Sequence, residues 1–571
     1  MMVLDDDNDD DNNDDDHDDN HDQDDAMWRY SERLQNCHNE ERSLDLTYFC
    51  SNIKDKINVV LALKPVEPPV RRYGTTEPPK VVPMRLVCVI DVSHSMAEPY
   101  GPDDDVSKLD KVKMFIQLLI HSLNNDDYLS IVTFGTVSNV IFPLTRMSRD
   151  GKVRAERALD DIRLGGVTNL SAGIFTGIDQ FNSPFAKSRY FDDNIILFTD
   201  GMANEGIVET DEMVAEVRKR MKDLKEECHF ERDYTIKICT MGTGGFLPEA
   251  VYSIGSAFSS DAFYFLEEDS NLELNMMKPV LFRQNGLVSS ISVVVTPLNG
   301  VTLNVQEMTD DYLNPELESS GNTPDGATYF IHDICVNMYR HIVCSLLLPK
   351  KHKKLLKGKD VLRLVVEYRN ATMQACVIEK TVTYEELPRK DVNNKDPDLA
   401  VNAVQNSRMS AQRMLNDAAL AMKKLDRTTA KNLLQDGVNE IRSYLELVDA
   451  QVASEESHLL LNNELEPILV NLENCTNYLG DFTVRWDDAW GRIKALSSSI
   501  AREVPTASGI YVHGAELYNA PKVQDKLSEL CDKLKDIYTS LGLATDTIDR
   551  YFGVVKELEG KLEEKFNETS V

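Results

Sequence analysis

The sequence lacks an uncharged apolar run long enough to span a bilayer, and its start lacks the basic and apolar regions of a secretory leader. It also lacks a Cys-x-x-Cys pair. Its ten cysteines are scattered, as is typical of reduced cytosolic or nuclear proteins. We therefore expect a chain without a transmembrane segment that is not secreted, with a cytoplasmic location and the nucleus as the alternative.

Positive charge is scarce. The chain has 62 Lys and Arg residues against 95 Asp and Glu residues, a formal net charge of -33. Nucleic acids and anionic membranes both require a clustered basic face, so we expect neither as a partner. Residues 5–25 contain 14 aspartates and no lysine or arginine, and such a segment buries too little apolar surface to fold. We interpret it as a disordered acidic tail.

An unbroken apolar run, Val-Cys-Val-Ile at residues 87–90, predicts a strand buried on both faces of a parallel sheet. The run continues directly into Asp91, and Ser93 and Ser95 follow at alternate positions. One carboxylate and two hydroxyls therefore follow the carboxyl end of a strand, where open α/β sheets bind ligands. Hard oxygen atoms suit a hard divalent cation such as Mg2+. Alternatively, the run could cap a following helix, because Asp and Ser side chains accept hydrogen bonds from free helix-start amides.

This Asp-x-Ser-x-Ser run resembles the metal-ion-dependent adhesion site (MIDAS) of the von Willebrand factor type A (vWA) domain. Two further segments follow in the order of that family. Residues 165–169, Gly-Gly-Val-Thr-Asn, supply a threonine after a glycine pair, and residues 195–201 supply an aspartate at the end of a second apolar strand. The match of all three segments favours a metal site over a helix cap.

The resemblance implies a metal site of five residues. Two serines and a threonine would bind the metal directly, and two aspartates would hold it more loosely, often through water: Ser93, Ser95 and Thr168, then Asp91 and Asp200. The expected metal is Mg2+, with Mn2+ or Ca2+ as alternatives. The sequence departs from the pattern at His94, where plant relatives more often have glycine. Because His94 lies between ligands, it need not bind the metal.

The pattern of strands and helices predicts three folded parts. Alternating strand-like and helix-like segments predict a doubly wound, Rossmann-like α/β vWA domain. Strand-like segments rich in Val, Ile, Thr and Tyr then predict a β-sandwich-like domain, and helical periodicity predicts a C-terminal helical region. The expected division is an acidic tail at 1–44, a strand and Pro-rich linker at 45–82, the vWA domain at 83–267, the β-sandwich-like domain at 268–390, a helical region at 391–500, a linker at 501–521 and C-terminal amphipathic helices at 522–571.

Two features bear on how these parts assemble. The strand predicted at residues 57–63 would join the β-sandwich-like domain, in which case the vWA domain is inserted into it. Apolar residues between 523 and 541 alternate at four- and three-residue steps, the spacing of a coiled-coil seam. This seam is shorter than about three to four heptads, so packing within the chain is favoured over homo- or hetero-oligomerisation.

A wider resemblance covers roughly residues 45–520. The segments at 142–147, 248–254 and 490–499 are similar to those of plant vWA proteins, many of which carry a RING-type zinc finger and act as E3 ubiquitin ligases. The β-rich segment resembles the intein-like domain that follows such vWA domains. A RING finger needs eight paired Cys and His ligands, whereas this N-terminal region offers Cys37, His38 and Cys50 without pairs. Ligase activity is therefore not implied.

These features predict a metal-dependent protein-binding protein and not an enzyme. Neutral hydroxyls compensate little of the metal's charge, so a partner's Asp or Glu would fill the open coordination position. Hydrolysis is less favoured, because the loops offer no positioned base, no Lys or Arg clamp and no nucleophile–His pair. The alternative function is a non-catalytic component or substrate adaptor of a ubiquitin-ligase assembly. A former metal site kept for its fold is a further alternative.

Overall fold

A computed structural model describes the parts of the chain that carry the predicted site. The described residues are 44–53, 56–65, 83–100, 106–182, 191–201, 203–228, 236–243, 249–258, 263–266, 280, 286–305, 326–335, 340–370, 374–388, 396–452, 454–481, 486–502, 533, 535–537 and 539. Residues 1–43 of the predicted acidic tail, 66–82 of the predicted Pro-rich linker, 503–521 of the linker predicted at 501–521 and most of the predicted seam lie outside the described residues. Leu44, placed in the tail by the sequence analysis, begins a strand, and residues 501–502 end a helix.

A six-stranded sheet carries the predicted site at one of its ends. Its order is β5-β4-β3-β6-β7-β8, in which β5 is antiparallel to its neighbour and the other strands are parallel. The strands are β3 (Met84–Asp91), β4 (Tyr128–Phe134), β5 (Ser138–Arg146), β6 (Asp192–Thr199), β7 (Lys237–Thr243) and β8 (Phe263–Leu266).

Helices cover both faces of this sheet. Along β3, Leu86, Cys88 and Ile90 share a core with α2 and α3. Val87 and Val89, at the alternate positions, share a second core with α4, α5 and α6. The central strand is therefore buried on both faces, and the doubly wound α/β fold is confirmed. The helices are α2 (Lys108–Ser122), α3 (Arg149–Leu159), α4 (Leu170–Asp179), α5 (Thr210–Cys228) and α6 (Glu249–Phe258).

Two antiparallel four-stranded sheets form a β-sandwich around a shared core. One has the order β1-β2-β12-β10 and the other β11-β9-β13-β14. Strand β2 pairs with β12. In the sequence, β2 precedes the strands of the six-stranded sheet and β12 follows them, so the sandwich is built from chain segments before and after that sheet. The elements are β1 (Leu44–Ile53), β2 (Lys56–Pro65), β9 (Gly286–Pro297), β10 (Thr302–Val305), β11 (Ala327–Cys335), β12 (Arg340–Leu347), α8 (His352–Leu355), β13 (Asp360–Asn370), β14 (Ala375–Thr383) and η3 (Tyr384–Glu386).

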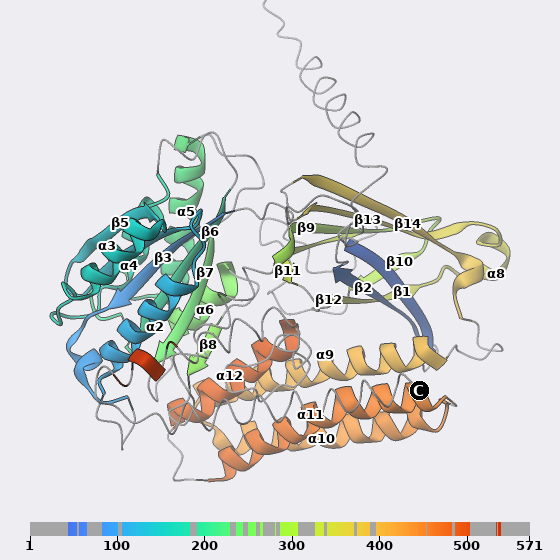
Figure 1. Ribbon diagram of the computed structural model, residues 1–571. Coiled ribbons are helices and arrows are strands. Elements are labelled where there is room, and N and C mark those ends of the chain that lie inside the picture. The colour runs from blue at the N-terminus through green and yellow to red at the C-terminus, as the bar shows by residue number, and fades with distance from the viewer. Residues whose placement is uncertain are drawn as a thin grey trace, which may run out of the picture.

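A helical layer joins the two β-containing parts (Figure 1). Helix α9 packs against β1, β2 and β12 of the sandwich, whereas α12 packs against α9 and against β8. Tyr252 of α6 meets Trp490 of α12 edge to face, with ring centroids 6.4 Å apart. The helices are α9 (Asp396–Lys423), α10 (Arg427–Asp449), α11 (Glu455–Gly480) and α12 (Trp486–Arg502).

Three sequence predictions can be checked against this fold. Within the described residues, no helix is both long and apolar enough to cross a membrane. Scattered cysteines are typical of reduced proteins, and the seven with described side chains are all buried: Cys50, Cys88, Cys228, Cys239, Cys344, Cys376 and Cys475. Ile537, a described residue of the predicted seam, packs against the core on the α2 side of the six-stranded sheet.

Candidate functional site

The predicted site lies where the sheet reverses its strand order. The chain passes from β3 to β4 on one side, whereas β6 lies on the other side of β3. Such a switch point opens a crevice at the carboxyl ends of the strands. Asp91 is the last residue of β3, and Asp200 follows the last residue of β6. Parallel pairing of the two strands therefore brings these carboxylates to the same edge.

Asp91 is buried, and both of its carboxylate oxygens accept hydrogen bonds. Oδ1 accepts from the backbone N–H of Ser93 at 2.8 Å, and Oδ2 accepts from the Thr199 hydroxyl at 2.6 Å. Burial raises the pKa of Asp91, although these hydrogen bonds lower it in part. The carboxylate therefore fixes the loop after β3 through the backbone of Ser93.

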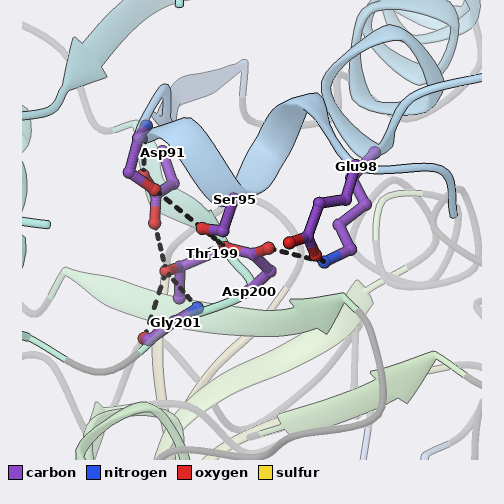
Figure 2. A network of polar contacts seen from close by, with 8 residues as sticks. Asp91, Ser95, Glu98, Thr199, Asp200 and Gly201 are labelled. Carbon is purple, nitrogen blue, oxygen red and sulfur yellow. Dashed lines mark hydrogen bonds and ion pairs between the residues drawn. The ribbon is translucent and has the colours of Figure 1, made fainter. Parts of the chain in front are cut away.

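Ser93, Ser95 and Asp200 form the centre of the site, and Figure 2 shows Ser95 beside Asp200. The hydroxyl oxygens of Ser93 and Ser95 lie 3.1 Å apart. The Ser95 hydroxyl donates to Oδ1 of Asp200 at 2.8 Å. The loops after β3 and β6, which are 105 residues apart in sequence, are thus linked directly through their side chains.

Thr168 reaches the site from the loop before α4. Its side chain is buried, and a Cβ built on Gly201 would lie 3.6 Å from its hydroxyl oxygen. Its backbone is held on both sides by Asn204: the N–H of Thr168 donates to the Asn204 side chain at 2.8 Å, and the N–H of Asn204 donates to the Thr168 carbonyl at 3.1 Å. The threonine hydroxyl therefore lies beside Gly201, the residue that follows Asp200 in the sequence.

The helix-cap alternative does not describe this loop. Ser93 precedes the short 3-10 helix η1 (His94–Ala97), yet its side chain makes no capping hydrogen bond. The next helix, α2, is capped by Ser107, whose side chain accepts from the N–H of Asp110. His94 has an exposed side chain, and its φ is not in the left-handed region that favours glycine. A histidine is therefore sterically compatible with this position.

A lysine missed by the sequence analysis lies at the site. Nζ of Lys108, the first residue of α2, is 2.7 Å from Oδ2 of Asp200 and 3.0 Å from Oε2 of Glu98. Burial lowers the pKa of Lys108, but hydrogen bonds and charge interactions with Asp200 and Glu98 outweigh that effect, so its pKa is raised. The sequence analysis found no Lys or Arg clamp within these loops, and Lys108 reaches Asp200 from α2. Lys108 and Asp200 are 92 residues apart, so no local sequence pattern contains both residues of this contact.

The oxygen atoms of the site fit a small, hard cation. Mg2+ binds its ligands at about 2.1 Å in octahedral geometry, which places adjacent ligands about 3.0 Å apart. The hydroxyls of Ser93 and Ser95 are hydrogen-bonded to each other at 3.1 Å, a separation that would also suit two adjacent ligands of Mg2+. Three or more His, Cys, Asp or Glu side chains do not gather as metal ligands anywhere in the described part of the chain. Any metal here would therefore depend on the hydroxyls.

A tight contact between backbones positions the loop that carries Thr168. The carbonyl of Gly135 accepts from the N–H of Asn169 at 3.0 Å, and a Cβ on Gly135 would lie only 2.3 Å from the carbonyl oxygen of Gly165. A Cβ on Gly165, in contrast, would have no neighbour within 4 Å. Glycine at 135 is therefore required by the close approach of the two loops.

We predict that Gly135→Ala lowers the free energy of unfolding by about 1–3 kcal/mol, because the methyl group forces the two loops apart. Gly165→Ala is the matched control and should change stability by less than about 1 kcal/mol. Urea denaturation of both variants and the wild type measures these differences. Equal stabilities of the two variants would contradict the close contact.

Comparison with known proteins identifies the domain that contains these residues. Residues 86–278 match the family model of the von Willebrand factor type A domain. This region is a vWA domain. The match covers the strands that carry Asp91 and Asp200 and the loop that carries Thr168. Domains of this family often mediate protein–protein interactions, and they commonly bind a divalent metal.

The matches to curated relatives cover about a quarter of this chain and a quarter or less of each relative. The uncharacterized protein YfbK of Escherichia coli is 27% identical over 28% of this chain and 24% of its own length. The E3 ubiquitin-protein ligase WAV3 of Arabidopsis thaliana is 30% identical over 27% of this chain and 20% of its own. Inter-alpha-trypsin inhibitor heavy chain H1 of Bos taurus is 26% identical over 24% of this chain and 15% of its own. The chain thus spans about a quarter or less of each relative.

Solved structures resemble the chain over a longer range. The match to a von Willebrand factor type A protein from Catenulispora acidiphila covers 71% of this chain and 88% of that protein's chain, with 14% identity and a TM-score of 0.47. The ArnB paralog VWA2 from Sulfolobus acidocaldarius covers 80% and 98%, respectively, with 13% identity and a TM-score of 0.44.

Proposed function

We propose that the chain is a metal-dependent protein-binding protein. Ser93, Ser95 and Thr168 would hold Mg2+ directly, with Mn2+ or Ca2+ as alternatives, and Asp91 and Asp200 would hold it more loosely. An Asp or Glu side chain of a protein partner would complete the coordination. The observation that carries the proposal is the 3.1 Å spacing of the two serine hydroxyls beside the Asp200 carboxylate.

The chemistry of the ligand set supports a partner that carries a carboxylate. All three of the proposed direct ligands are neutral hydroxyls, so much of the charge of a divalent cation would remain uncompensated. An incoming carboxylate supplies that negative charge as well as a hard oxygen ligand. The chain itself has a formal net charge of -33, which repels acidic partners at long range. A cation at the site would therefore be needed for an acidic residue to bind there.

Selection from a random peptide library tests this function. Peptides are bound to the immobilised full chain in Mg2+ and eluted with a chelator. We expect eluted peptides to be enriched in Asp and Glu relative to the starting library, and the enrichment to vanish on the Ser93→Ala/Ser95→Ala variant. Circular dichroism checks that the variant is folded. Recovery of the same peptides from both proteins would overturn the proposal.

A second candidate function is a non-catalytic subunit or substrate adaptor of a ubiquitin-ligase assembly. It is favoured by the similarity to WAV3, whose name describes it as an E3 ubiquitin-protein ligase, although the similarity covers only 20% of that relative. Cross-linking of the tagged chain in cells, followed by mass spectrometry, tests this role. Complexes without any ubiquitin ligase would exclude it.

A further inference from the structure

Lys108 places a positive charge next to the proposed metal site. Its Nζ lies 2.7 Å from Oδ2 of Asp200, and the two side chains are only 11% and 1% exposed, respectively. A pair this close and this buried is little screened by salt. The positive charge of the ammonium therefore offsets the negative charge of the Asp200 carboxylate.

The two oxygens of Asp200 have separate partners. Oδ1 accepts the hydroxyl hydrogen of Ser95, and Oδ2 accepts from the ammonium of Lys108. One carboxylate thus separates the ammonium from a hydroxyl that would bind the metal. A divalent cation beside Ser95 would be repelled by the ammonium across a buried carboxylate, where the effective dielectric constant is well below that of water.

The backbone around Lys108 holds the ammonium in this position. Lys108 begins α2 directly after its cap Ser107, and its backbone N–H donates to the carbonyl of Glu98 at 3.0 Å. The side chain of Glu98 also accepts from the ammonium, at 3.0 Å, and is 66% exposed. Glu98 therefore offers a second, more hydrated partner if the ammonium moves away from Asp200.

We propose that Lys108 is a built-in counter-ion that weakens metal binding at this site and thereby makes metal and partner binding interdependent. The inference rests on the proposed function. Because Lys108 offsets the charge of Asp200, a cation bound to the hydroxyls would have little negative charge beside it to balance its own. The carboxylate of a partner supplies this charge, so each of the two ligands increases the affinity of the chain for the other.

Titration calorimetry of the full chain with Mg2+ and Mn2+ tests the role of Lys108. We expect Lys108→Met to bind either metal at least about tenfold more tightly than the wild type, a change of about 1.4 kcal/mol, because the variant removes a buried positive charge that repels the cation. Lys108→Arg keeps the charge and should stay within about threefold of the wild type. Lys113→Met is the matched control on the same helix, where Nζ donates to a backbone carbonyl at 3.3 Å, and should leave the affinity unchanged.

Thermal unfolding with and without Mg2+ gives a second readout. Lys108→Met should have a lower Tm than the wild type without metal, because Asp200 then lacks its cation, and a larger rise in Tm on addition of Mg2+. Equal affinities and equal shifts in the wild type and Lys108→Met would overturn the inference while leaving the proposed function intact. Absence of site-specific binding in all variants would overturn both.

Discussion

Asp193→Asn is expected to lower the free energy of unfolding by about 3–5 kcal/mol, because it removes the charge that faces a buried guanidinium. Arg85 and Asp193 lie opposite each other on β3 and β6, and their side chains are 4% and 0% exposed. Nε of Arg85 donates to Oδ1 of Asp193 at 2.6 Å, and a second hydrogen bond joins Nη2 to Oδ2. The guanidinium also lies 4.7 Å from the ring centroid of Phe191.

The chain contains a matched exposed pair as the control. Arg220 makes two hydrogen bonds to Oδ1 and one to Oδ2 of Asp179, but both side chains are more than 40% exposed. Asp179→Asn should therefore reduce stability by less than about 1 kcal/mol. The shift in the urea midpoint of each variant measures the two effects. Equal losses would mean that burial does not determine the strength of the pair at β3 and β6.

Asp91→Asn is expected to stabilise the metal-free protein at neutral pH by about 1 kcal/mol and to weaken metal binding by about 10–100-fold. Burial raises the pKa of Asp91, so the native state binds its proton more tightly than the unfolded state does. Stability then falls as pH rises from the unfolded pKa through the higher native pKa, and the loss persists above that range. Asparagine does not ionise and can still accept the hydrogen bond from Ser93, so the variant avoids this loss.

Urea denaturation of both proteins as a function of pH, with metal removed by a chelator, measures the effect of Asp91. The stability gained by Asp91→Asn should grow as pH rises through the native pKa of Asp91. Added Mg2+ should then stabilise the wild type more than the variant. A variant that is less stable than the wild type at every pH would show that the charge of Asp91 is compensated within the metal-free protein.

The sequence predicts the elements of the fold well where burial is continuous. Val87, Cys88 and Val89 lie in the middle of the six-stranded sheet, and all are fully buried, as the unbroken apolar run indicated. Strand β5 was not predicted, because it contains Pro143 and mixes polar with apolar residues. It lies at a sheet edge, where proline and exposed positions are tolerated.

The sequence predicts the proposed ligands better than their surroundings. Ser93, Ser95 and Asp200 follow apolar strands, so the local sequence pattern identifies them as candidates. In the structure, hydrogen bonds link their side chains. Thr199 contacts Asp91 and Lys108 contacts Asp200. The two residues of each contact are about 100 positions apart in the sequence, so no local pattern contains both. One signal was present: a lysine in the first turn of a helix opposes the helix dipole, which predicts an acidic partner nearby.

Titration of the full chain with Mg2+ and Mn2+, compared with Ser93→Ala/Ser95→Ala, tests the central claim most directly. Both proteins carry the Asp-rich run at 5–25, so any weak binding to that run cancels in the difference. We expect a saturable one-site component in the wild type that is absent from the variant. Identical titrations of two folded proteins would contradict a metal site at these serines.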